Sequence, residues 1–389
     1  MVNGSWVKHD TYRRVNGEWV KQDEYLTVPI INYLTFSSAE AFTIGVNDAA
    51  KHWDGTLYYS TDTTTWSEWD GATAIASAEH SGEQRIYMRG VGNSVITGSS
   101  NSNYRWTMTG SNIRCDGNIE NLLNHEAVSE GAHPEMGAYC YSSMFFESTA
   151  LITSPELPAT DLSEYCYYYM FSGTGLTTPP KLPATTLAVS CYQGMFYGCT
   201  GLTNAPKLPA KEMAEYCYNG MFSSTGLTTA PELPATTLAK QCYAGMFRNC
   251  TNLTNAPQLP ASVLAQSCYR NMFNGCSNLT LAPSLPATTL AEDCYYWMFR
   301  ECTRLATIPT LPATTLAKNC YRLMFMECTS IKLSATKTGD YQNEYRVPNN
   351  GTGTVSDEDD VYNMFGNTGG TFTGTPTINT TYYTSNAVV

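Results

Sequence analysis

Residues 182–207 read LPATTLAVSCYQGMFYGCTGLTNAPK, and similar stretches fill the middle of the chain. Residues 233–258 read LPATTLAKQCYAGMFRNCTNLTNAPQ, and residues 285–310 read LPATTLAEDCYYWMFRECTRLATIPT. A Cys-Tyr pair recurs at steps of 25 or 26 residues, at Cys140, Cys166, Cys191, Cys217, Cys242, Cys268, Cys294 and Cys320. Such a repeat length predicts a solenoid, in which each unit buries its apolar face against its neighbours.

The spacing inside one unit predicts a helix followed by a strand-like segment. Apolar residues recur at every fourth position in two adjacent stripes, Leu187–Cys191–Met195–Cys199 and Ala188–Tyr192–Phe196. Two such stripes form one face of an α-helix, and the variable positions 189, 190, 193, 194, 197 and 198 then face outward. Pro206 and Pro209 exclude a helix from the segment that follows. We therefore expect an α/β solenoid.

The unit resembles the repeat of the BspA-type leucine-rich repeat family in its Met-Phe-x-x-Cys-x-x-Leu form. The matching residues are Met195, Phe196, Cys199 and Leu202, and the resemblance covers about residues 136–335. It implies a right-handed helix-and-strand solenoid of leucine-rich-repeat-like, 25–26-residue units over 136–335. The strict LPATTLA segment departs from the commoner form of the family.

The first 110 residues predict β-structure. VNGSWVKHDTY at 2–12 and VNGEWVKQDEY at 15–25 each contain Asn-Gly, a hairpin-turn signal, so we expect 1–27 to be a β-hairpin attachment segment. This pair resembles segments of tail-associated proteins of tailed bacteriophages. Residues 28–110 alternate in polarity between turn residues, which predicts an all-β sandwich. Their YYSTDTTTWSEW stretch resembles immunoglobulin-like modules that precede such repeats in gut-bacterial surface proteins and their phages.

The segments on either side of the repeats are expected to act as caps. Residues 111–135 form the connector and N-terminal cap, with a helix expected at 117–126, and residues 336–389 form an insertion and the C-terminal cap. The acidic run 357–360 has two interpretations, a calcium site or a helix N-terminus capped by Ser356. Because the run lacks the alternating ligand spacing of a calcium loop, the capping interpretation is favoured.

The 14 cysteines are expected to be buried, reduced thiols. Cys191 and Cys199 would lie about 12 Å apart along a helix, and equivalent cysteines on packed helices about 10 Å apart, both too far for a disulfide. The sequence contains no C-x-x-C pair, so zinc spacing is absent. We expect neither a metal nor a cofactor.

Composition argues against several classes of function. Charged residues make up 14% of the chain and the net charge is −12, which disfavours a nucleic-acid partner. No apolar run is long enough to span a membrane, and the first residues lack the apolar segment of a secretory signal. The five histidines form no H-E-x-x-H, and no G-x-S-x-G or phosphate-binding loop occurs. An enzyme is therefore not expected.

The candidate ligand-binding residues are aromatic side chains at outward helix positions, because exposed aromatic rings supply rigid contact area. They are Tyr168, Tyr169, Tyr197, Tyr216, Tyr296 and Trp297. Two alternatives stay open: these positions vary because nothing packs on them, or the strand-like face carries the ligand.

The resemblances imply a non-enzymatic surface-binding protein, first of all a bacteriophage tail fibre or receptor-binding protein located in the virion tail. Its expected partners are a glycan or protein of the bacterial cell surface and, through residues 1–27, other tail proteins. A homo-oligomer is expected, and tail fibres of this kind are often trimers. The alternatives are a BspA-type adhesin at the bacterial cell surface or outside the cell, and a structural filament or spacer subunit.

Overall fold

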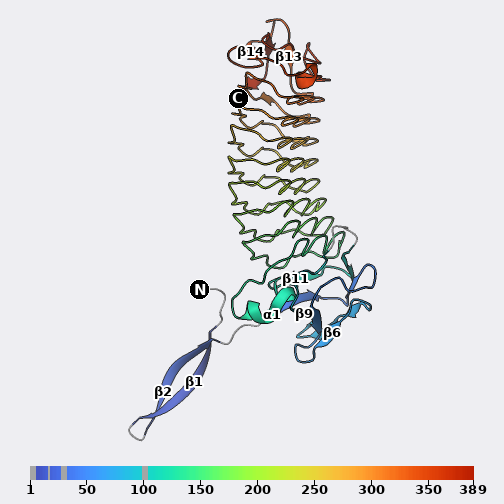
Figure 1. Ribbon diagram of the computed structural model, residues 1–389, viewed down its shortest axis with the longest axis vertical. Helices are drawn as coiled ribbons and strands as arrows, with labels where there is room; N and C mark the ends of the chain where they lie inside the picture. Colours follow the sequence, from blue (N-terminus) through green and yellow to red (C-terminus); the bar gives the residue numbers. More distant parts are fainter. Residues whose placement is uncertain (1–5, 16–17, 28–32, 99–103) are drawn as a thin grey trace.

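The computed structural model describes the backbone of residues 6–15, 18–27, 33–98 and 104–389, and the side chains from residue 33 onward within these ranges. Strands β1 (Trp6–Val15) and β2 (Glu18–Thr27) pair antiparallel along their whole length, from Trp6 opposite Thr27 to Val15 opposite Glu18 (Figure 1). The two copies of the tandem motif thus supply the two strands of one hairpin. The Asn-Gly pairs at 3–4 and 16–17 lie outside the described residues.

The described residues of 33–98 and 104–116 form two antiparallel sheets. The first has the order β10 (Trp106–Thr109), β4 (Thr43–Val46), β7 (Ile75–Ala76). The second has the order β11 (Arg114–Asp116), β3 (Leu34–Ser38), β9 (Glu83–Val91), β5 (Thr56–Ser60), β6 (Ser67–Trp69), with β8 (Ala78–His80) also paired to β9. The central strands bury side chains in a common core, which includes the fully buried Leu34 and Phe36 of β3, whereas the short strand β8 has no buried residue.

This β-module leads directly into the first repeat. Helix α1 (Asn121–Ser129) contacts β9 and buries Leu122 and Leu123. The backbone N–H of Ile96 donates to the Cys140 carbonyl at 2.9 Å, and that of Trp106 donates to the Met144 carbonyl at 2.8 Å. The β-module therefore satisfies backbone groups that would otherwise be exposed at the end of the repeat array.

The repeats, which we call coils, stack along the long axis of the molecule (Figure 1). Within a coil, every fourth residue of the apolar segment has a left-handed backbone conformation, as at Ser190 (φ 53°), Gly194 (φ 61°) and Gly198 (φ 73°). Equivalent residues of the other coils share it, among them Tyr165, Tyr169 and Gly173 in the preceding coil. An α-helix requires negative φ at every residue, so no helix forms here.

Backbone hydrogen bonds in the coils alternate between two directions. The N–H of Tyr192 donates to the Cys217 carbonyl of the next coil at 3.1 Å, whereas the following N–H, of Gln193, donates to the Ser190 carbonyl of its own coil at 3.2 Å. Met195 then donates back to the Tyr192 carbonyl, also at 3.2 Å. Successive turns thus satisfy half of the donors locally, and the neighbouring coil satisfies the rest.

The predicted α/β solenoid preceded by an all-β sandwich is therefore wrong as a fold class. Within the part of the chain that the structure describes, strands account for 19% and helix for 4%, and the sheets are small, none of them closed or solenoid-like. The single α-helix of the described residues, α1, precedes the coils. The physical reason lies in the period: apolar residues spaced at four residues drift by about 40° per step around an α-helix, whereas a turn repeated every four residues keeps them aligned.

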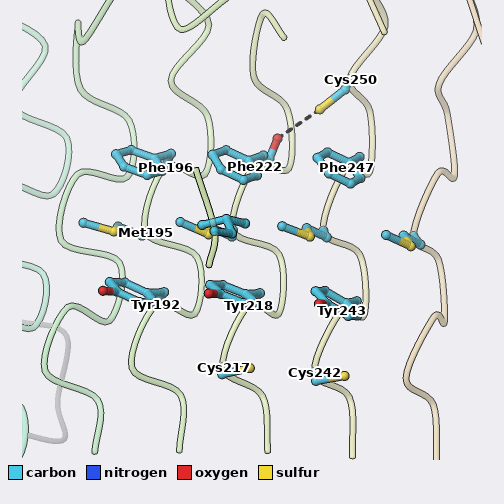
Figure 2. Packing of buried hydrophobic residues seen from close by; sticks show 14 of the residues in the cluster. Tyr192, Met195, Phe196, Cys217, Tyr218, Phe222, Cys242, Tyr243, Phe247 and Cys250 are labelled. Carbon is cyan, nitrogen blue, oxygen red and sulfur yellow. Dashed lines mark hydrogen bonds between the residues drawn. The ribbon is translucent and has the colours of Figure 1, made fainter. Parts of the chain in front are cut away.

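The coil interior consists of side-chain ladders, one rung per coil (Figure 2). Tyr192, Tyr218 and Tyr243 are at most 1% exposed, and their ring centroids are 5.8 and 5.9 Å apart. Phe196 and Phe222 are fully buried and stack at 5.6 Å with their planes 8° apart. Because these rings recur at the same place in successive coils, the core is continuous from the β-module to the C-terminal cap.

All 14 cysteines are buried and free, which confirms the prediction of buried, reduced thiols. The coils nevertheless lie closer together than the 10 Å expected of packed helices, since equivalent rings stand less than 6 Å apart. Cys250 donates its thiol hydrogen to the Phe222 carbonyl of the preceding coil at 3.0 Å (Figure 2). In the coil of Cys217, which lacks this cysteine, the Thr225 hydroxyl instead donates to the Phe222 carbonyl of its own coil, at 2.8 Å.

The C-terminal residues close the other end of the stack. Strands β13 (Leu333–Ser334), β15 (Thr381–Thr384) and β14 (Asn343–Arg346) form one sheet in this order, and β12 (Thr307–Ile308) pairs in parallel with β16 (Ala387–Val388). A 3-10 helix, η1 (Glu358–Val361), supplies backbone to the last coil: the Tyr321 N–H donates to the Asp360 carbonyl at 2.9 Å. The chain thus caps its own last coil.

Candidate functional site

One long side of the stack, which we call the turn face, carries the side chains of the turns at positions 189, 190, 193, 194, 197, 198 and their equivalents in other coils. Not all of these positions face outward as expected: Ser190 is 1% exposed and Gly194 is buried, whereas Tyr197 is 44% exposed. Near the β-module this face carries five tyrosines from three successive coils. We call them the tyrosine patch: Tyr139, Tyr165, Tyr168, Tyr169 and Tyr197.

The rings of the tyrosine patch form an unbroken chain of contacts. Tyr139 and Tyr165 stack at 4.5 Å with planes 8° apart, and Tyr165 meets Tyr168 edge-on at 5.7 Å. Tyr168 meets Tyr169 at 4.6 Å, and Tyr169 lies 6.2 Å from Tyr197. Tyr197 is 44% exposed, and the other four are half-buried. The patch is therefore a continuous aromatic surface that solvent reaches.

The coil backbone positions these rings. Tyr139, Tyr165 and Tyr169 all occupy left-handed positions, but so do non-glycine residues in the coils without tyrosines, so this strain belongs to the fold and not to the site. The Tyr169 ring lies against Gly194 of the next coil, where an added β-carbon would be 2.5 Å from the ring. A glycine is therefore required at 194 for the ring to lie there.

Burial raises the pKa of Tyr139, Tyr168 and Tyr169 above the ordinary value for tyrosine, which itself lies well above neutral pH. At neutral pH these three residues thus offer hydroxyl groups as well as ring faces. Such an array suits contact with sugars or with protein surfaces, since each ring combines an apolar body with a polar tip.

A second aromatic cluster lies farther along the stack, at Tyr296 and Trp297, whose rings are 4.7 Å apart. Arginine side chains cover both rings: the Arg270 guanidinium lies 4.6 Å from the Tyr296 centroid and that of Arg300 lies 5.4 Å from Trp297. Arg270 also pairs with Asp293 of the next coil at 3.1 Å. These contacts tie neighbouring coils together and leave less ring surface for a ligand.

The six sequence-predicted site residues thus fall into three places. Tyr168, Tyr169 and Tyr197 are brought together in the patch, Tyr296 and Trp297 form the arginine-covered cluster, and Tyr216 stands apart beneath Lys240 at 5.8 Å. Sequence reasoning missed Tyr139 and Tyr165, which directly precede the Cys-Tyr pairs of the first two coils. Comparing this column between units could have found them, because it holds Tyr only in the coils of Cys140, Cys166 and Cys217.

The acidic run lies at the start of η1 and caps it. Asp357 is the N-cap, one residue later than predicted, and Asp360 accepts from its backbone N–H at 3.1 Å in a reciprocal capping box. Ser356 donates its hydroxyl to the Asp360 carboxylate at 3.0 Å. In the ranges where side chains are described, no three His, Cys, Asp or Glu residues gather as metal ligands would.

Comparisons of the chain with protein-family models, curated proteins and solved structures found no match. Among the described residues, none of the helices has the length and apolar character to cross a membrane.

Proposed function

We propose that this chain is a non-enzymatic surface-binding protein that contacts a cell-surface glycan or protein through the tyrosine patch. The observation that carries the proposal is the unbroken contact of five tyrosine rings across three coils, half-buried or exposed on one face. Aromatic side chains dominate binding surfaces because they bury much area and lose little conformational entropy.

The biological setting that we propose is a bacteriophage tail, with the stack directed at the bacterial host. The likeness of the tandem motif in 1–27 to phage tail segments supports this setting, and so does the order of hairpin, β-module and repeats along the chain. In this setting the hairpin joins other tail proteins and the protein acts as a homo-oligomer. Several copies then gain avidity from individually weak contacts.

The test is binding of fluorescently labelled full-length protein to a panel of intact bacteria, with epithelial cells and matrix proteins alongside. Saturable labelling of a few bacterial strains supports the tail fibre. Labelling of epithelial cells or matrix alone favours a BspA-type adhesin, and labelling of nothing favours a structural spacer.

Variants locate the contact surface. The double variant Tyr168→Ala/Tyr197→Ala should weaken labelling by a factor of about 10 to 100, as expected for the loss of two contact residues. Tyr216→Ala is the matched control, since Tyr216 lies on the same face outside the ring chain, and it should label cells as the parent does. Equal labelling by all three proteins would move the contact away from the patch.

A further inference from the structure

A second surface of unusual composition lies on the β-module, on the side of the larger sheet that faces away from the core. Asp116 of β11, Thr35 of β3 and Tyr87 of β9 stand directly opposite one another in three adjacent strands. Directly opposed residues share one face of a sheet, so these three side chains form a row. The row brings a carboxylate, a hydroxyl and an aromatic ring together.

Aromatic rings flank this row. The Tyr33 ring lies 4.7 Å from that of Trp66, 5.0 Å from His125 and 6.4 Å from Tyr87. The guanidinium of Arg89, a residue of β9, lies over the Trp66 ring, 4.3 Å from its centroid, and packs against it. Tyr33 is half-buried, so its ring is both supported by its neighbours and accessible.

The row and the rings border an open pocket of about 490 Å³ between the β-module and the first coil. The side chains that line it are those of Tyr33, Thr35, Thr63, Tyr87, Asp116 and Glu156. Asp116 and Glu156 are exposed, and within the described part of the chain their carboxylates accept no hydrogen bond. The pocket therefore combines aromatic walls with free hydrogen-bond acceptors from two parts of the chain.

We propose that this pocket binds one or two residues of a neutral saccharide. A sugar ring presents an apolar C–H face, which fits an aromatic ring such as Tyr33, and hydroxyl groups that donate to carboxylates. The volume of the pocket lies in the range of small-molecule binding sites. The two carboxylates disfavour an anionic sugar, and the polar lining disfavours an apolar ligand. This site is separate from the tyrosine patch, and the inference does not rest on the proposed function.

The experiment titrates the full-length chain with neutral di- and trisaccharides of glucose, galactose and N-acetylhexosamines, and with 3′-sialyllactose as an anionic probe. Calorimetry measures affinity, and saturation-transfer NMR identifies the sugar protons that touch the protein. We expect saturable binding of at least one neutral sugar, with C–H protons of one ring face most strongly saturated. The proposal is overturned if no neutral sugar shows saturable binding at concentrations up to about 20 mM, because the Kd is then too weak for a specific saccharide site.

Two substitutions place the sugar in the pocket. Asp116→Asn keeps the side-chain shape and should weaken binding about tenfold, since it removes a charged acceptor. Asp161→Asn is the matched control at an exposed carboxylate of a coil, and it should bind as the parent does. Unchanged affinity in Asp116→Asn, or tighter binding of 3′-sialyllactose than of lactose, overturns the proposal. Tyr168→Ala/Tyr197→Ala should keep its saccharide affinity, so failure of cell labelling and failure of this pocket are distinguishable.

Discussion

Replacement of Gly220 by alanine tests the coil backbone directly. If the residue is in a left-handed turn, the substitution lowers the free energy of unfolding, and if it is in an α-helix, the substitution raises it. Gly220 has φ +61°, and a β-carbon added there would meet nothing within 4 Å. Steric clash is therefore absent, and the effect reduces to the backbone energy of an L-residue in the left-handed region, about 1–2 kcal/mol. In a helix the same substitution would stabilise the protein by about 1 kcal/mol.

The assay is thermal unfolding of the full-length chain followed by circular dichroism. We expect Gly220→Ala to lower the Tm by roughly 2–8 °C, the range that corresponds to 1–2 kcal/mol in a unit of this size. Ser224→Gly is the counterpart in the same coil: Ser224 also has a positive φ (60°), so removal of its β-carbon should leave the Tm unchanged or raise it. A rise in Tm for Gly220→Ala together with a fall for Ser224→Gly would refute the turn backbone.

Two further predictions concern the buried ladders. Phe222→Ala should destabilise the stack by about 3–5 kcal/mol in urea unfolding, because Phe222 is fully buried between Phe196 and Phe247; a loss below about 1 kcal/mol would contradict the ring ladder. Stability should also fall as the pH rises above about 9, the ordinary thiol range, because burial raises the pKa of Cys191 and Cys242 to about 12 and the folded chain then binds more protons than the unfolded one. A Tm that stays constant between pH 8.5 and 11 would count against this protonation difference.

Burial within the coils could be predicted from the sequence, although the backbone could not. Of the seven residues assigned to the apolar face, Cys191, Tyr192, Met195, Phe196 and Cys199 are buried, whereas Leu187 and Ala188 are partly buried against the core. Hydrophobicity decides which side chains leave water, and that choice is the same for a helix and for a series of turns. The backbone differs because the neighbouring coil accepts every second N–H, a contact that a single unit does not contain.

The local signals against a helix were present in the sequence. Glycine recurs at 194, 198, 220 and 245, on the positions that became left-handed, and glycine is a poor helix former. The column of Gly194, Gly220 and Gly245 also holds Tyr169, Trp297 and Leu323, and these residues obscure the glycine preference because bulky residues rarely adopt positive φ. The strain of positive φ at these bulky residues is offset only in the regular stack. There, the backbone N–H and C=O groups of each coil form hydrogen bonds with the coils on both sides.

For the proposed binding surfaces too, some features follow from the sequence and others only from the tertiary structure. The sequence by itself determined the repeat length, the buried columns and the outward aromatic residues, because all of these follow from residue type and spacing along the chain. The tertiary structure alone decided that Tyr139 and Tyr165 join Tyr168 in one patch, and that Asp116 and Glu156 line one pocket. Both assemblies depend on how close neighbouring coils and strands lie, and that distance is set by hydrogen bonds between segments far apart in the sequence.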